Sequence, residues 1–188
     1  ESVLGRWSAS KKERILRSRI EGTAALVAAL REAVQPPPVL VCASAVGYYG
    51  NEQYHEVDER DAPGSDFLAQ VTRAWEAEAC KAEAFGVRVV RLRIGLVLGA
   101  DGGAAALLRP VFRLGLGGRL GSGLQWMSCV HVEDVAGLIF HAIERTELKG
   151  AVNAVMPAPV TNREFTREAA KAVRRPAWFP VPAFVLRA

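Results

Sequence analysis

Helix-length amphipathic segments alternate with short apolar runs along the first half of the chain. Apolar residues recur at near-helical intervals over residues 16–34, until three prolines at 36–38 end the pattern. Apolar runs follow at 39–43 and 87–93, and a second helical segment lies between them. Because a crossover through one helix is right-handed, this order predicts two parallel strands in one sheet.

Capping signals set the expected helix limits. Ser10 and Glu13 have capping-box spacing, which predicts a first helix over residues 11–34, and Thr161 and Glu164 have the same spacing. The other elements expected from the pattern are helices at 65–85, 104–114, 132–145 and 161–173 and a strand at 151–155.

Glycines at 115, 118 and 121 have the spacing of a dinucleotide phosphate-binding turn. Such a turn needs a strand before it and a helix that begins within it, so that backbone amides meet the pyrophosphate. Here the pattern predicts a helix before the glycines and a turn toward Gln125 and Trp126 after them. We therefore expect a loop near a substrate rather than a phosphate-binding turn.

Length and charge restrict the class of protein. A chain of 188 residues that is 50% hydrophobic is long enough for one core and short for two. The formal charge of +4 comes largely from cations on the first helix. These cations are Lys11, Lys12, Arg14, Arg17 and Arg19. A solvated helix face explains them better than nucleic-acid binding, because no aromatic interleaving or nucleic-acid motif accompanies them.

Cysteine usage and hydropathy point to a cytoplasmic protein. Cys42, Cys80 and Cys129 are widely spaced and lie in apolar or helical sequence, which predicts free, buried thiols in a reducing compartment. The three histidines form no metal-ligand pattern, so we expect no structural metal site. No apolar run approaches the roughly 18 residues that a membrane span needs.

Five motifs stand in order along the chain, and they are Ser-Ala-Val-Gly-Tyr-Tyr-Gly at 44–50, Trp-Glu at 75–76, Arg-x-Arg-x-Gly-x-Val-Leu-Gly at 91–99, the Gly-rich segment 112–125, and Val-His-Val-Glu-Asp-Val-Ala at 130–136. Together they resemble an extended short-chain dehydrogenase/reductase, in particular its atypical epimerase-like branch, described as sugar-nucleotide epimerase-like or cell-division-inhibitor-like. Their order and spacing hold over almost the whole chain, so the resemblance is more specific than a single motif.

The resemblance implies an α/β, Rossmann-like fold with an incomplete parallel sheet, helices and a small substrate-binding lobe. Residues 1–95 resemble the second half of an NAD(P)-binding domain, and residues 96–188 resemble part of the substrate lobe. The family's Gly-rich pyrophosphate turn belongs to a first half that this sequence does not contain. We therefore expect either a further N-terminal segment or a second chain that completes the sheet, and a homo-oligomer is one form of the latter.

The cofactor that the resemblance implies is NADP(H), with NAD as the alternative. Glu13, Arg19, Ser44 and Val97 match positions that contact the cofactor in similar proteins. Without the resemblance, Glu13 and Arg19 would be surface charges and Val97 a core residue. The implied substrate is a nucleotide-sugar or a similar polar small molecule. Its diphosphate would meet basic groups beside the Gly-rich segment, and the candidates are Arg109 and Arg119.

The expected chemistry departs from the family pattern. In active members, a Ser or Thr at the Ser44 position polarises the reacting oxygen, and a Tyr four residues before a Lys is the acid/base. Here the corresponding helix reads Phe-Leu-Ala-Gln-Val-Thr at 67–72, without that pair. Tyr48 and Tyr49 are candidate substitute proton donors, with aromatic packing as the alternative role, and Ser44 has loop capping as its alternative.

Three functions remain open at this point. The first is an NADP(H)-dependent oxidoreductase or epimerase-like protein that transfers hydride, and the second is a non-catalytic dinucleotide-binding regulator that has lost the Tyr and Lys. The third is a nucleic-acid or partner-binding module built on the basic helix. We favour the first, with a small-molecule substrate and without nucleic acid or membrane as partner.

Overall fold

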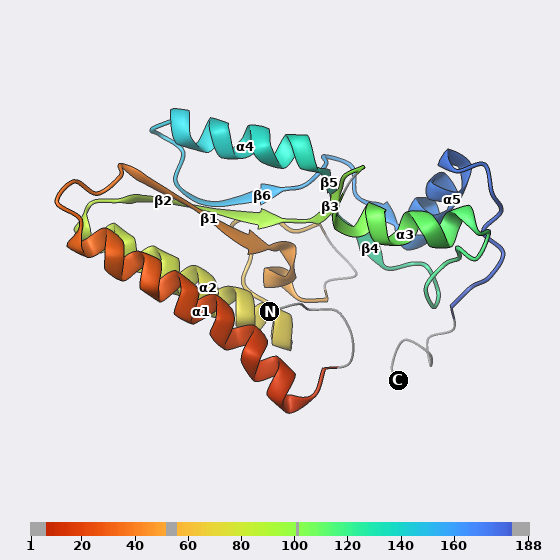
Figure 1. Ribbon diagram of the computed structural model, residues 1–188, viewed down its shortest axis with the longest axis horizontal. Coiled ribbons are helices and arrows are strands. Elements are labelled where there is room, and N and C mark those ends of the chain that lie inside the picture. Colours follow the sequence, from red (N-terminus) through yellow and green to blue (C-terminus); the bar gives the residue numbers. More distant parts are fainter. Residues whose placement is uncertain (1–6, 52–55, 101, 182–188) are drawn as a thin grey trace. The chain divides into compact units, whose positions relative to one another are not determined.

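A computed structural model describes residues 7–51, 56–100 and 102–181 of the chain (Figure 1). The chain divides into two compact units. The first contains residues 1–94 and 137–154, and the second contains residues 95–136 and 155–188.

The first unit is built on a parallel sheet. Its strands are β1 (Val39–Ala45), β2 (Arg88–Ile94) and β6 (Gly150–Ala154), in the order β1-β2-β6. Strands β1 and β2 pair from Val39 with Arg88 to Ala45 with Ile94. Two helical segments in succession join them, α2 (Phe67–Cys80) and the short 3-10 helix η2 (Lys81–Phe85). The predicted pair of parallel strands and the helix between them are therefore confirmed.

Side chains of β2 point alternately to the two faces of the sheet, so the core lies in two layers, one on each face. Val89 packs with residues of α1 (Ala9–Glu32) and α2, including Val27 and Ala79. Leu92 faces the other way and packs with Ala142 of α4 (Val132–Glu144). Figure 1 shows α1 and α2 on one face of this sheet and α4 on the other.

Helix ends agree with the sequence in most places but not at the first helix. The expected Ser10–Glu13 capping box is wrong, because Ser10 already lies inside the first turn of α1. Ser8 has the extended backbone of an N-cap, and its hydroxyl accepts a hydrogen bond from the Lys11 amide at 3.3 Å. The capping box of Thr161 with its third following residue is confirmed at the start of α5 (Asn162–Ala172).

The described part of the second unit includes two small sheets, helices α3 (Gly103–Arg113) and α5, and the first residues of α4. In one sheet β3 (Leu96–Leu98) runs parallel to β5 (Cys129–His131), and in the other β4 (Trp126–Met127) runs antiparallel to β7 (Val160–Thr161). Helix α3 lies in this unit together with α5. The helix expected at 104–114 is therefore confirmed, as is the one expected at 161–173.

The glycine-spaced segment after α3 is a loop, as expected, and its glycines permit close backbone packing. A Cβ added at Gly118 would lie 1.9 Å from the Phe179 carbonyl oxygen, and one at Gly117 would lie 2.4 Å from the Phe112 ring. The Gly121 amide donates to the Val181 carbonyl at 2.8 Å. These glycines therefore let the chain near residue 180 lie directly against the loop.

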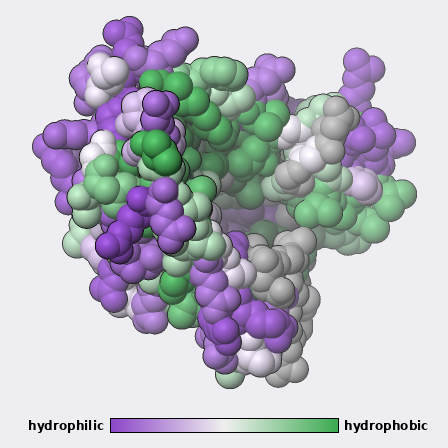
Figure 2. Space-filling model, turned by 60° about the vertical axis from the view of Figure 1, so that its left-hand side comes forward, coloured by the Kyte–Doolittle hydropathy of each residue, from purple (hydrophilic) through white to green (hydrophobic). Residues whose placement is uncertain are grey.

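Large apolar side chains remain exposed in both units. Phe140 and Ile143 of α4 are exposed in the first unit, and Leu107 and Trp178 are exposed in the second. Figure 2 shows hydrophobic residues gathered in patches among hydrophilic ones on the face it presents. Such patches are typical of surfaces that contact another chain or segment. The expected homo-oligomer or completing segment stays a prediction.

Replacing Gly118 by alanine should destabilise the protein. The added Cβ would clash with backbone atoms that cannot move without breaking the loop's contacts, so we expect Gly118→Ala to lower the free energy of unfolding by about 1–3 kcal/mol. Gly22 in α1 has nothing within 4 Å of an added Cβ, and Gly22→Ala should raise that free energy by about 0.5–1 kcal/mol. Urea unfolding measures both. Equal stability of Gly118→Ala and the parent would contradict the packing role.

Candidate functional site

Three polar residues form one row across the carboxyl end of the parallel sheet. Ser44 of β1 pairs in register with Arg93 of β2, and Arg93 pairs with Asn153 of β6. Ligands of open α/β sheets bind at the carboxyl ends of the strands. This row is therefore the candidate functional site of the first unit.

Glu76 of α2 holds the row from the helix side. Its carboxylate accepts hydrogen bonds from the Ser44 hydroxyl at 2.7 Å and from Arg93 Nε and Nη2 at 2.9 and 3.1 Å. Arg91, two residues earlier on the same face of β2, donates a further bond at 3.1 Å. Ser44, Glu76 and Arg93 are all buried, with 2–4% of their surface exposed. The carboxylate therefore binds two strands and a helix together inside the protein.

Arg93, the more buried of the two arginines in this cluster, stays charged. Burial alone would lower the pKa of Arg93, but hydrogen bonds to Glu76 and Tyr49 outweigh it and raise that pKa above its usual value. Its guanidinium also lies over the Tyr48 ring, with Cζ 3.4 Å from the ring centroid. Such a cation–π contact is most favourable where water is excluded, as it is here.

The two tyrosines, both in the short 3-10 helix η1 (Val46–Tyr49), have different environments. Tyr49 is buried, and its hydroxyl donates to Asn153 Oδ1 at 2.7 Å and accepts from Arg93 Nη1 at 2.9 Å. Burial raises the pKa of Tyr49, and the bond from Arg93 offsets this only in part. Tyr48 is half-buried, and within the described part of the chain its hydroxyl makes no hydrogen bond.

The geometry distinguishes the three predicted catalytic residues chemically. The Ser44 proton is committed to Glu76, and the Tyr49 phenol is committed to Asn153. A phenol whose pKa is raised is a weaker acid, and therefore a poorer proton donor, near neutral pH. Tyr48 has the one hydroxyl of the three that is available to a ligand. A catalytic role for any of them stays a prediction.

The predicted cofactor residues Glu13 and Arg19 lie on α1, and Val97 lies elsewhere. Glu13 is exposed, whereas Arg19 is half-buried with its guanidinium 5.5 Å from the centroid of the Trp75 ring. Val97 belongs to β3 of the second unit, where it pairs with Val130. Ser44 is the only one of the four in the row at the sheet end, and the cofactor role of all four stays a prediction.

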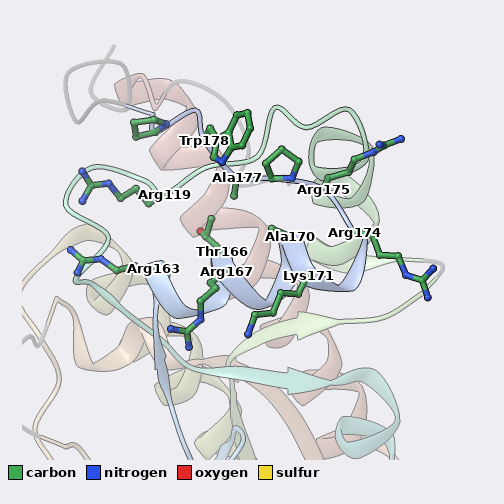
Figure 3. A pocket seen from close by; sticks show the side chains of 12 residues that line it. Arg119, Arg163, Thr166, Arg167, Ala170, Lys171, Arg174, Arg175, Ala177 and Trp178 are labelled. Atoms are coloured by element: carbon green, nitrogen blue, oxygen red, sulfur yellow. The ribbon is translucent and has the colours of Figure 1, made fainter.

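The two predicted substrate arginines do not share a pocket. Exposed Arg109 of α3 borders a largely apolar pocket of about 580 Å³ between residues of α3, β5 and α5. Arg119 borders a second pocket of about 630 Å³ (Figure 3). The residues of α5 that line it are Arg163, Thr166, Arg167, Ala170 and Lys171. A single diphosphate in one of these pockets would therefore meet one of the two arginines and not the other.

Sequence reasoning missed the members of the cluster that carry its charge. Glu76, Arg91 and Arg93 stand in the quoted motifs, but only as marks of resemblance. Two arginines at alternate positions of a buried strand point to the same face, and a carboxylate must then meet them. That signal was present in the sequence, whereas the position of Asn153 on a third strand needed the fold.

Metal ligation and membrane insertion find no support in the described ranges. In residues 7–51, 56–100 and 102–181 no group of three or more His, Cys, Asp or Glu side chains is placed to hold a metal ion. Over the same ranges no helix has the length and apolar character to cross a bilayer. The thiols are free, with Cys129 buried and Cys42 and Cys80 half-buried. Burial raises the pKa of Cys42 to about 11, which keeps it protonated and unreactive near neutral pH.

Known proteins from several organisms are similar to this chain over almost its whole length. "Epimerase family protein SDR39U1 homolog, chloroplastic" of Arabidopsis thaliana is 44% identical over 97% of this chain and 53% of its own length. "Epimerase family protein MT2273" of Mycobacterium tuberculosis is 45% identical over 97% of this chain and 60% of its own. The chain thus spans between half and two thirds of these relatives.

Solved structures agree with this. The human epimerase family protein SDR39U1 (isoform2), solved with NADPH, matches with a TM-score of 0.92 and 36% identity, covering 100% of this chain and 64% of that one. A nucleoside-diphosphate sugar epimerase from Corynebacterium glutamicum matches with a TM-score of 0.78 and 33% identity, over 98% and 41% of the two chains. The fold is therefore α/β and Rossmann-like, as expected. Residues 4–154 match the NAD dependent epimerase/dehydratase family, and the chain belongs to that family.

Proposed function

We propose that this chain serves in an NADP(H)-dependent oxidoreductase of epimerase-like type, acting on a nucleotide-sugar or a similar polar small molecule. The observation that carries the proposal is the NADPH in the human relative, whose fold matches the whole of this chain. This chain spans 64% of that relative. The activity is therefore proposed for a protein of the relative's full length, of which this chain would form part.

The row at the sheet end fits the nicotinamide end of such a cofactor. Ser44 and Tyr48 lie at the carboxyl end of β1, where nucleotides bind in folds of this class. The bound cofactor would supply or accept a hydride. The Tyr48 hydroxyl would then hold the proton of the reacting oxygen, while Arg93 keeps a positive charge against the Tyr48 ring.

One observation favours a second candidate, the non-catalytic dinucleotide-binding regulator. The Ser44 hydroxyl is committed to the buried Glu76 and the Tyr49 hydroxyl to the half-buried Asn153, and the helix at 67–72 lacks the family's Tyr and Lys. A protein of that kind would keep the cofactor pocket and lose turnover. Binding and turnover therefore distinguish the two candidates.

Cofactor affinity should depend on residues ahead of this chain. Because the family's pyrophosphate turn lies in its first half, we expect the 188-residue chain to bind NADPH weakly or not at all. The same chain extended at its N-terminus by about 60–80 residues of its gene, a βαβαβ half, should bind it. Calorimetry with NADPH measures both. Micromolar binding by the short chain would mean that its own residues hold the phosphates.

Removing one hydroxyl at a time should separate the two tyrosines. In the extended protein, Tyr48→Phe keeps the ring against Arg93, so we expect the rate of NADPH oxidation with a carbonyl substrate to fall by about 10² with little change in stability. Tyr49→Phe is the matched variant. It breaks the bonds to Asn153 and Arg93 and should lower the free energy of unfolding by about 1–3 kcal/mol. A rate loss confined to Tyr49→Phe would contradict the assignment, and tight NADPH binding without turnover in the parent would favour the regulator.

A further inference from the structure

The pocket between α3, β5 and α5 is apolar over most of its wall. All its lining residues belong to the second unit, and its volume of about 580 Å³ lies within the range of small-molecule sites. Of the seventeen residues that line it, three carry a full charge. The larger apolar side chains are those of Leu98, Leu108, Phe112, Met156 and Phe165. A ligand in this pocket would therefore exchange water for apolar contacts over most of its surface.

Two alternate residues of β5 face this pocket. Cys129 and His131 lie two positions apart on the strand, so their side chains point to the same face of the small sheet. Leu98 pairs in register with His131 and lines the pocket as well. Cys129 is 1% exposed, and burial raises the pKa of its thiol without a contribution from any described charged group. The wall at Cys129 is therefore a surrounding of low polarity.

The charges in the lining disfavour an anionic ligand. Glu164 and Glu168, one turn apart on α5, both line the pocket. The Thr161 amide and hydroxyl each donate to the Glu164 carboxylate at 2.8 Å, and these bonds hold the pKa of Glu164 below its usual value. Glu168 is ionised as well, because two cations of α5 bind it at 3.0 Å. An anion beside the exposed Arg109 would therefore face two carboxylates, whereas a neutral ligand would not be repelled.

His131 offers the pocket one directed hydrogen-bond donor. Its Nδ1 accepts a bond from the Glu133 backbone amide at 3.3 Å. The Glu133 carboxylate lies 3.8 Å from the same nitrogen, beyond hydrogen-bond distance. In a neutral imidazole the nitrogen that accepts carries no proton, so the proton of His131 is on Nε2. Within the described residues nothing accepts a bond from Nε2, which leaves this donor for an oxygen of a ligand.

We propose that the pocket between α3, β5 and α5 binds an uncharged apolar molecule whose carbonyl oxygen accepts a hydrogen bond from His131 Nε2. This assigns a neutral ligand to the pocket where the family resemblance predicts a diphosphate at Arg109. The site uses none of the residues proposed for hydride transfer, and binding here requires neither NADP(H) nor turnover. An anionic amphiphile held by Arg109 is the competing occupant, which Glu164 and Glu168 disfavour.

Equilibrium dialysis of the 188-residue chain against methyl naphthyl ketone, without NADPH, tests the proposal. This ketone is planar and uncharged and has one carbonyl, and we expect sub-millimolar binding from its apolar burial. Isopropenylnaphthalene has the same shape with a methylene in place of the oxygen. His131→Phe keeps an aromatic ring and removes the donor, so it should shift the ratio of the two dissociation constants by about three- to tenfold against the ketone.

Variants that fill the pocket locate the bound ligand. Ala169 lines the pocket, and Ala169→Leu should weaken binding of the ketone by about tenfold or more, because the larger side chain occupies its space. Ala172→Leu makes the same change at an exposed lining residue, where folding is not at risk. Ala158→Leu is the matched control, since Ala158 is exposed and lies outside the pocket, and it should change the affinity less than about twofold.

Three results would overturn the proposal. The first is that the ketone does not bind, and the second is that Ala169→Leu and Ala172→Leu weaken its binding no more than Ala158→Leu. The third is that His131→Phe leaves the ratio of ketone to alkene binding unchanged. Naphthoate that binds more tightly than the ketone, and loses this advantage in Arg109→Gln, would identify an anionic amphiphile as the occupant instead. Circular dichroism of each variant excludes unfolding as the cause.

Discussion

The buried Glu76 carboxylate is the interaction on which the candidate site depends. It lies between a serine of β1 and two arginines of β2, and all its partners point to the same face of the sheet. An ionised carboxylate is costly to bury unless charges and hydrogen bonds surround it. In this protein four hydrogen bonds do so, and in return the carboxylate fixes the positions of Ser44 and Arg93. The remaining members of the cluster follow, because Arg93 orients both Tyr48 and Tyr49.

This arrangement explains why the hydroxyls of Tyr48 and Tyr49 have different environments. One buried guanidinium faces both rings, but of the two tyrosine hydroxyls it donates a hydrogen bond only to that of Tyr49, and Asn153 accepts the proton of that hydroxyl. Tyr48 contributes the face of its ring, and its hydroxyl is not bound by any residue that the structure describes. Neighbouring residues of the same type thus have different tasks, one in holding the sheet end together and the other in meeting a ligand.

Much of the first unit could be predicted from the sequence, because its elements obey local rules. The apolar runs at 39–43 and 87–93 and the helix between them define a parallel pair without further information. The start of α1 could not be predicted as well, since Ser8 and Ser10 are both good caps and only the backbone geometry distinguishes them. For Tyr48 and Tyr49, the sequence alone left two equal candidates. Their difference arises from Asn153, about 100 residues away in the chain, and no local pattern records such a contact.

In the second unit, too, contacts between distant segments could not be predicted from the sequence. The glycines at 115–121 were predicted to form a loop because no helix begins within them, and this is confirmed. Their physical purpose, the close approach of the Phe179 carbonyl to Gly118, depends on a segment about 60 residues later. The pocket that Arg119 of this loop borders is also lined by Arg163 of α5. Helix periodicity alone could not show that these two positive charges lie at one pocket.

A double-mutant cycle on Glu76 and Arg93 tests the central claim, that one buried ion cluster holds the sheet end together. The free energies of unfolding of Glu76→Leu, Arg93→Met and the double variant are compared by urea unfolding. Each single change leaves a buried charge without its main partner, so the account predicts a coupling energy of about 2 kcal/mol or more. The exposed pair Arg17 and Glu21, changed to methionine and leucine in the same way, should give less than about 0.5 kcal/mol. Additive losses at Glu76 and Arg93 would contradict the account.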